Sequence, residues 1–162
     1  DKVLILFENA SFRHSKNNYK NILRDINLNI HENELIGVIG LIGSGKSMLL
    51  KTIINETFYT PTNKSKYTKR CDIKIGYVRQ TPFILNNTIK NNIILDLKYN
   101  EEIYKNVLHY TEFMYDVEQL PGKSECEIGE RGINLSGGQK TRLSLARCLY
   151  RHLIIKFDIM LF

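Results

Sequence analysis

A chain of 162 residues, 43% hydrophobic and 25% charged, has the composition of one ordinary globular domain, and no apolar run approaches the ~20 residues that a bilayer-spanning helix needs. The net charge of +6 is moderate and its lysines are scattered, apart from Lys64 to Arg70, so we expect a solvated face and no nucleic-acid partner. The three cysteines are odd in number and lack metal-binding spacing, which predicts free thiols in a reducing compartment.

The first half of the chain alternates between apolar and polar residues, a pattern typical of strands in a mainly antiparallel sheet. One run, Leu35 to Gly40, is continuously apolar and predicts a strand buried on both faces. Residues 47–55 have helical spacing, whereas residues 56–70 are polar and predict a loop. The segments expected to be strands are Val3 to Phe7, Ala10 to His14, residues 26–30, Leu35 to Gly40 and residues 73–78.

The second half becomes helical in character from Thr88 onward. Asn100 is a plausible N-cap for a helix over residues 101–110, whose apolar side chains share one face. A further capped helix is expected over residues 136–150, and residues 158–162 predict one more buried strand. A strand, a glycine-rich loop and a helix, followed by further strands, predict an α/β core with a parallel sheet.

Residues 40–47 read GLIGSGKS and match the pattern G-x-x-x-x-G-K-[ST] between a predicted strand and a predicted helix. Such glycines let backbone N–H groups turn toward phosphate oxygens at a helix N-terminus; the alternative is a chance glycine turn. Lys46 would face the β- and γ-phosphates, and Ser47 would offer its hydroxyl to Mg²⁺, so ATP and Mg²⁺ are the expected ligands. The residues expected to line the nucleotide here are Leu41, Ile42, Gly43, Ser44, Gly45, Lys46, Ser47 and Met48.

A second motif, LSGGQ at residues 135–139, also opens a predicted helix. Taken alone, Ser136 could be an ordinary N-cap followed by a glycine turn. Together with the first motif, however, it resembles the nucleotide-binding domains of ATP-binding cassette (ABC) transporters, whose signature is LSGGQ. Residues 128–150 are similar to the first such domain of the multidrug-resistance-protein branch, and residues 77–93 resemble that branch's Q-loop and the helix after it.

The resemblance covers nearly the whole chain and implies an α/β fold of the ABC ATPase type. This fold has a P-loop NTPase core, an antiparallel β subdomain and a helical subdomain. Within one domain, residues 1–80 would form the β subdomain and P-loop core, and residues 81–135 the helical subdomain. Residues 136–162 would then form the signature helix and the Walker B strand.

The same resemblance implies a role for each motif residue. Gln80 would be the Q-loop glutamine, which reaches Mg²⁺ and the attacking water, so Lys46 and Gln80 are the expected catalytic residues. Two domains of this family close head to tail, and each signature contacts the γ-phosphate of the ATP held by the partner. The two motifs of one chain would therefore serve two different ATP molecules. The signature residues are Leu135, Ser136, Gly137, Gly138 and Gln139.

The adenine-stacking position and the region of the catalytic carboxylate both depart from the family pattern, and Arg79 replaces the proline often found before the Q-loop glutamine. The adenine-stacking aromatic position, two residues after Phe12, holds His14, which either stacks on the base or is simply exposed. Asp158 is either the Walker B aspartate or, as we favour, the start of the strand that leads to it. No catalytic carboxylate follows it within the 162 residues, so we expect this fragment to bind ATP and hydrolyse almost none.

The resemblance implies the ATP-hydrolysing domain of an ABC exporter on the cytoplasmic face of a membrane. Its expected partners are a second nucleotide-binding domain and the transmembrane domains of the transporter. One alternative is a degenerate ABC domain that holds ATP with little hydrolysis. Another is a soluble ABC ATPase that works on DNA or ribosomes.

Overall fold

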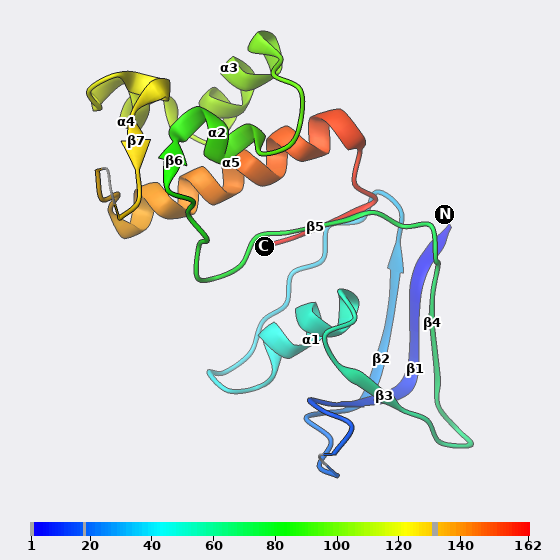
Figure 1. Ribbon diagram of the computed structural model, residues 1–162. Helices are drawn as coiled ribbons and strands as arrows, with labels where there is room; N and C mark the ends of the chain where they lie inside the picture. Colours follow the sequence, from blue (N-terminus) through cyan, green and yellow to red (C-terminus); the bar gives the residue numbers. More distant parts are fainter. Residues whose placement is uncertain (1, 18, 131–132) are drawn as a thin grey trace. The chain divides into compact units, whose positions relative to one another are not determined.

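The computed structural model describes residues 2–17, 19–130 and 133–162, and the chain divides into two units, residues 1–73 and 74–162 (Figure 1). The first unit contains β1 (Val3–Arg13), β2 (Leu23–His31), α1 (Lys46–Ile53), β3 (Phe58–Thr60) and β4 (Lys66–Lys69). The second unit contains β5 (Ile75–Tyr77), β6 (Asn87–Thr88), α2 (Ile89–Ile94), α3 (Glu101–Tyr110), α4 (Met114–Gln119), η1 (Lys123–Glu125), β7 (Glu127–Ile128), α5 (Gly137–Ile155) and β8 (Ile159–Leu161).

Strand β1 is the centre of the antiparallel sheet in the first unit. β2 pairs with one edge of β1, while β3 and β4 pair with the other edge. The two strands predicted at the N-terminus are one strand, because a bulge at Asn9 interrupts the alternation without ending the pairing. Asn9 has a φ of 45°, and its N–H donates to Oδ1 of Asn27 at 2.9 Å. The antiparallel prediction is confirmed, and the predicted break in the strand is wrong.

The segment 56–70, predicted to be a loop, contains β3 and β4. Aromatic packing on β1 explains the difference. The ring centroids of Tyr59 and Phe12 are 5.5 Å apart, and Tyr67 lies 5.0 Å from Phe7 and 5.1 Å from Phe12. Phe7 and Phe12 are almost fully buried, so these contacts form part of the core of the sheet. A polar sequence pattern therefore forms strands here because one tyrosine of each strand packs on the buried phenylalanines of β1.

The apolar run at residues 35–40 is not a strand, and its predicted burial is wrong. Leu35 is 99% exposed and Ile39 is 94% exposed. A strand forms only when a neighbouring strand supplies the ladder of backbone hydrogen bonds, and none of the described strands pairs with this run. The helix predicted after it is confirmed as α1.

Helix α5, orange in Figure 1, supplies the spine of the second unit. Leu143, Ala146 and Tyr150 are fully buried on it, and it contacts both α2 and α3. The Tyr150 hydroxyl donates to the Lys98 carbonyl at 2.8 Å and accepts from the N–H of Asn100 at 2.9 Å. Both predicted helices are confirmed, with α5 running five residues further than expected, to Ile155.

A parallel pair joins β5 to β8, with Ile75 opposite Ile159. The prediction of a strand within residues 158–162 is confirmed, as is the strand within residues 73–78. The parallel pair and the antiparallel sheet of the first unit together have the predicted α/β character. The three cysteines are free, and two of them, Cys126 and Cys148, are buried.

A fully buried amide, Asn92 of α2, joins the segment that precedes α2 to helix α5. Its Oδ1 accepts from the N–H of Leu85 at 2.8 Å, and its Nδ2 donates to the carbonyls of Leu85 and Thr88 at 3.0 Å each. Arg147 of α5 donates to the Asn92 carbonyl at 2.7 Å, to Asn92 Oδ1 at 3.1 Å and to the Phe83 carbonyl at 2.8 Å. Asn92 and Arg147 therefore fix the course of residues 83–88 against the helix.

We expect Asn92→Ala to lower the free energy of unfolding by about 2–3 kcal/mol, because the backbone groups of Leu85 and Thr88 lose their partners on this buried side chain and Arg147 loses one of its three acceptors. Asn91→Ala is the matched control, since among the described residues the Asn91 side chain donates a single, exposed hydrogen bond, to Oδ1 of Asn87. The control should cost less than about 1 kcal/mol. Urea denaturation of the two variants measures the difference, and equal losses would contradict the role given to Asn92.

Candidate functional site

The glycine-rich loop ends at the N-terminus of α1, in a conformation that suits a bound anion. Gly45, the N-cap, has a φ of 97°, and Gly43 has a φ of 81°, values that side chains rarely adopt. No described side chain caps α1, so its first N–H groups keep their hydrogen-bonding capacity for a ligand. A Cβ on Gly45 would also stand 3.0 Å from Leu23 Cδ2, which leaves little room for any other residue.

Lys46, the first residue of α1, bends back over this loop. Its ammonium Nζ donates to the carbonyls of Gly40 at 2.9 Å and Leu41 at 2.8 Å. A positive charge is thereby held beside uncapped helix N–H groups, which is the combination that binds phosphate. The expected nucleotide-lining residues Leu41, Ile42, Gly43, Ser44 and Ser47 are exposed, whereas Gly45, Lys46 and Met48 are partly buried.

His14 lies directly after β1 and is exposed, while Phe12, two residues earlier, is buried in the core of the sheet. This placement leaves the imidazole free of the core. It agrees with both interpretations of His14, as a base-stacking residue and as an exposed histidine.

Gln80 belongs to the second unit, where it is exposed three residues after the end of β5. The segment that follows it approaches the signature within that unit. A cavity of about 490 Å³ is lined by Pro82 and Leu85 on the Gln80 side and by Asn134 and Leu135 on the signature side. The segment that follows Gln80 and the signature are therefore neighbours in the fold, although some fifty residues separate them in the chain. The loop of Lys46 and Ser47 belongs to the first unit.

The signature opens α5 through a capping box. Ser136 Oγ accepts from the N–H of Gln139 at 3.3 Å, and Gln139 Oε1 accepts from the N–H of Ser136 at 2.9 Å. Gly137 and Gly138 are exposed, and no described heavy atom beyond its own neighbourhood stands within 4 Å of a Cβ built on Gly137. Leu135 is buried and anchors the motif. The backbone of the two glycines is therefore accessible to a ligand from outside the chain.

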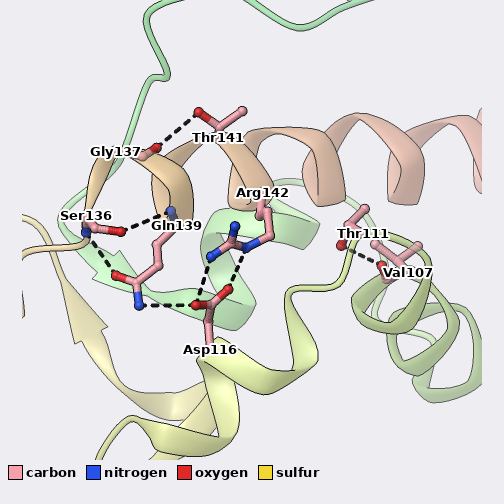
Figure 2. Close-up of polar contacts among 8 residues, drawn as sticks. All are labelled: Val107, Thr111, Asp116, Ser136, Gly137, Gln139, Thr141 and Arg142. Carbon is pink, nitrogen blue, oxygen red and sulfur yellow. Dashed lines mark hydrogen bonds and ion pairs between the residues drawn. The ribbon is translucent and has the colours of Figure 1, made fainter.

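Asp116 of α4 faces the first turn of α5, a contact that the sequence did not predict (Figure 2). Its Oδ2 accepts from Arg142 Nε at 2.6 Å, and its Oδ1 accepts from Arg142 Nη2 at 3.0 Å and from Gln139 Nε2 at 3.3 Å. The hydrogen bond from Arg142 holds the pKa of Asp116 below its ordinary value, so the carboxylate is ionised near neutral pH. Gln139 is thus held on both sides of its amide.

Asp158 precedes β8 and is used locally. Its Oδ2 accepts from the N–H of Lys74 at 2.7 Å, and its own N–H donates to the Lys74 carbonyl at 2.8 Å. This geometry agrees with the expectation that Asp158 starts the strand.

None of the described helices is long and apolar enough to cross a bilayer.

Most of this chain is similar to proteins of known family. A sequence model described as ABC transporter matches residues 23–156. ABC transporter C family member 8 of Dictyostelium discoideum is 37% identical over 150 residues, which cover 93% of this chain. ATP-binding cassette sub-family C member 2 of Homo sapiens is 42% identical over 151 residues, and multidrug resistance protein mrp-7 of Caenorhabditis elegans is 40% identical over 133 residues.

The aligned part is a small share of each relative. The human protein is matched over 92% of this chain and 9% of its own length, and the Caenorhabditis elegans protein over 81% of this chain and 8% of its own length. The Dictyostelium discoideum protein is likewise matched over 9% of its length. The chain therefore spans less than a tenth of the curated relatives that it matches.

Proposed function

The chain belongs to the ABC transporter family, as an ATP-binding domain of the multidrug-resistance-protein type, and we propose that this domain hydrolyses ATP to drive export across a membrane. The observation that carries the proposal is the pair of anion cradles, one at the start of α1 and one at the start of α5. A single bound triphosphate needs one P-loop, so the second cradle calls for a second nucleotide.

In this proposal the first cradle holds the chain's own ATP. The uncapped N–H groups of α1 would bind the phosphate oxygens, and Lys46 would leave the carbonyls of Gly40 and Leu41 for the β- and γ-phosphates. The chemistry that Mg²⁺ supplies when bound is neutralisation of charge between these phosphates. Ser47 and Gln80 carry exposed oxygen atoms of the kind that Mg²⁺ prefers, and they are the residues that would hold it. His14 would stack on the adenine.

The second cradle would serve the ATP of a partner domain that closes head to tail on this one. The N–H groups of the exposed residues Gly137 and Gly138, with the Ser136 hydroxyl, would approach the γ-phosphate from outside. Leu135 and Gln139 would hold these groups in place from within the chain. Closure on ATP and release after hydrolysis would then move the transmembrane domains, with this domain on the cytoplasmic face.

The proposed partners are therefore a second nucleotide-binding domain and the membrane-spanning part of a longer transporter. The match to sub-family C members supports this assignment over an ABC ATPase that works on DNA or ribosomes. The division into a β subdomain with the P-loop core (1–80), a helical subdomain (81–135) and a signature and Walker B segment (136–162) is part of the same proposal.

A second candidate is a domain that binds ATP and hydrolyses little of it. The carboxylate of Asp158 accepts the N–H of Lys74 just before β8, so it is engaged locally at the start of that strand. We expect the 162-residue chain to bind ATP with almost no turnover, since residues 159–162 include no carboxylate that could act as a general base. Release of inorganic phosphate measures this, and robust Mg²⁺-dependent hydrolysis would show that the catalytic groups lie within these residues.

We expect Lys46→Ala to weaken ATP binding by about 10- to 100-fold, because it removes the charge opposite the β- and γ-phosphates. Titration of the domain with a fluorescent ATP analogue measures the affinity. Lys51→Ala is a matched control, since Lys51 lies in the last turn of the same helix. Affinity retained by Lys46→Ala in a folded domain would remove the basis for the P-loop assignment.

Gly137→Asp should separate the two cradles. The new carboxylate would block and repel the phosphate that binds at the signature. If that phosphate belongs to the partner's ATP, the carboxylate does not reach the ATP in the chain's own P-loop. The variant should bind ATP as well as the wild type and fail to associate with the partner domain in ATP.

The measurement for Gly137→Asp is paired: nucleotide titration of the single domain, and sedimentation of the two domains with and without ATP. Gly137→Ala is the control, because a Cβ at this position meets open space. Loss of nucleotide binding by the folded Gly137→Asp monomer would mean that the signature serves its own chain's ATP.

A further inference from the structure

The carboxylate of Asp116 lies beneath the signature, on a different element from it (Figure 2). Its side chain is only 16% exposed, and it receives three hydrogen bonds from the first turns of α5. Two of these come from Arg142 and pair the charges in a fork; the third comes from the amide of Gln139. The carboxylate is thus shared between an ion pair and the signature itself.

The third hydrogen bond determines which way the Gln139 amide faces. An ionised carboxylate only accepts hydrogen bonds, so Asp116 requires Nε2 of Gln139 on its side. Oε1 then faces the opposite side, where it accepts the N–H of Ser136 at 2.9 Å. With the amide reversed, two donors would meet at Ser136 and two acceptors at Asp116. Asp116 therefore selects the one orientation that closes the capping box.

The capping box in turn sets the position of the groups that face a ligand. Ser136 Oγ and the N–H groups of Gly137 and Gly138 follow the turn that the box fixes. The negative charge of Asp116 does not oppose an anion there, because Arg142 neutralises it at 2.6 Å. Removal of the carboxylate would loosen the cradle without removing any group that touches a phosphate.

We propose that Asp116 is a positioning residue for the signature: by orienting the Gln139 amide, it shapes the cradle that receives the γ-phosphate of the partner's ATP. The inference rests on the proposed head-to-tail function. The competing view is that Asp116 and Arg142 form a structural ion pair that only joins α4 to α5. If Asp116 positions the signature, its loss weakens ATP-driven association even in a domain that is as stable as the wild type. If the ion pair is only structural, association changes only as far as stability does.

The chain offers a matched ion pair as a control. Asp96 accepts from Arg151, also on α5, at 2.6 and 3.3 Å, with no contact to the signature. Asp116→Asn and Asp96→Asn each replace the charged partner of one arginine of α5 by a neutral amide. Only Asp116→Asn also changes the group that faces Gln139, because an amide can present an Nδ2 donor as well as an Oδ1 acceptor and no longer requires Nε2 of Gln139 on its side.

The experiment uses the full-length protein that contains this chain, with energy transfer between labels on the two nucleotide-binding domains reporting closure. We expect Asp116→Asn to raise the ATP concentration for half-maximal closure by about tenfold, the effect of losing a hydrogen bond to a charged group. Photolabelling by an azido-ATP should show unchanged P-loop affinity. Asp96→Asn should change neither quantity.

Two further variants separate positioning from stability. Arg142→Lys keeps the Asp116 carboxylate and a cation beside it, so closure should stay within about twofold of the wild type although the fork is lost. Gln139→Ala keeps the ion pair but should reproduce the defect, and Asp116→Asn added to it should have no further effect. If Asp116→Asn does not fold, Gln139→Ala serves as the test variant in its place.

The outcomes are distinct. Closure by folded Asp116→Asn at the wild-type ATP concentration, or an equal defect in Arg142→Lys, overturns the inference and leaves the proposed function intact. An additive effect of Asp116→Asn in the Gln139→Ala background overturns it as well. If ATP does not close the wild-type domains, the proposed function itself fails.

Discussion

Burial of one face of helix α5 is the constraint on which the second unit depends. Leu143, Ala146 and Tyr150 lose all contact with solvent, so the helix has one rotational setting about its axis. That setting presents Arg147 to Asn92 and Arg142 to Asp116. Because the polar partners are fixed by the apolar face, packing in the middle of the helix determines the geometry of the signature at its start.

Both cradles are helix N-termini, but their N-caps differ. At α1 the N-cap is a glycine and the helix N–H groups are left for a ligand, with Lys46 held over the loop. At α5 the N-cap is Ser136, closed by Gln139, and the exposed glycines offer only their backbone. The first arrangement suits a phosphate that is enclosed by its own chain, and the second suits a phosphate that arrives with a partner. If the proposed function holds, this difference explains why one chain carries both cradles.

The features that sequence predicted well are local. The caps at Asn100 and Ser136 and the glycines of both motifs depend on residues within a few positions of each other, so their chemistry is visible in the pattern. Residues 35–40 and 56–70 were mispredicted because strand formation depends on a distant partner: the first run lacks one among the described strands, and the second finds one on β1. Asp116 was missed because α4 has six residues and no described side-chain cap, and because its partner Arg142 lies 26 positions away.

The central claim is that the two cradles of one chain bind different ATP molecules. The most direct measurement is a cryo-electron microscopy structure of the full-length protein with bound ATP under conditions that block hydrolysis. The account predicts that the γ-phosphate beside Ser136 and Gly137 belongs to a nucleotide whose β-phosphate is held by the partner domain's P-loop. The phosphates beside Lys46 should likewise meet the partner's signature. A single nucleotide that touches both Lys46 and Gly137 of the same chain would contradict the account.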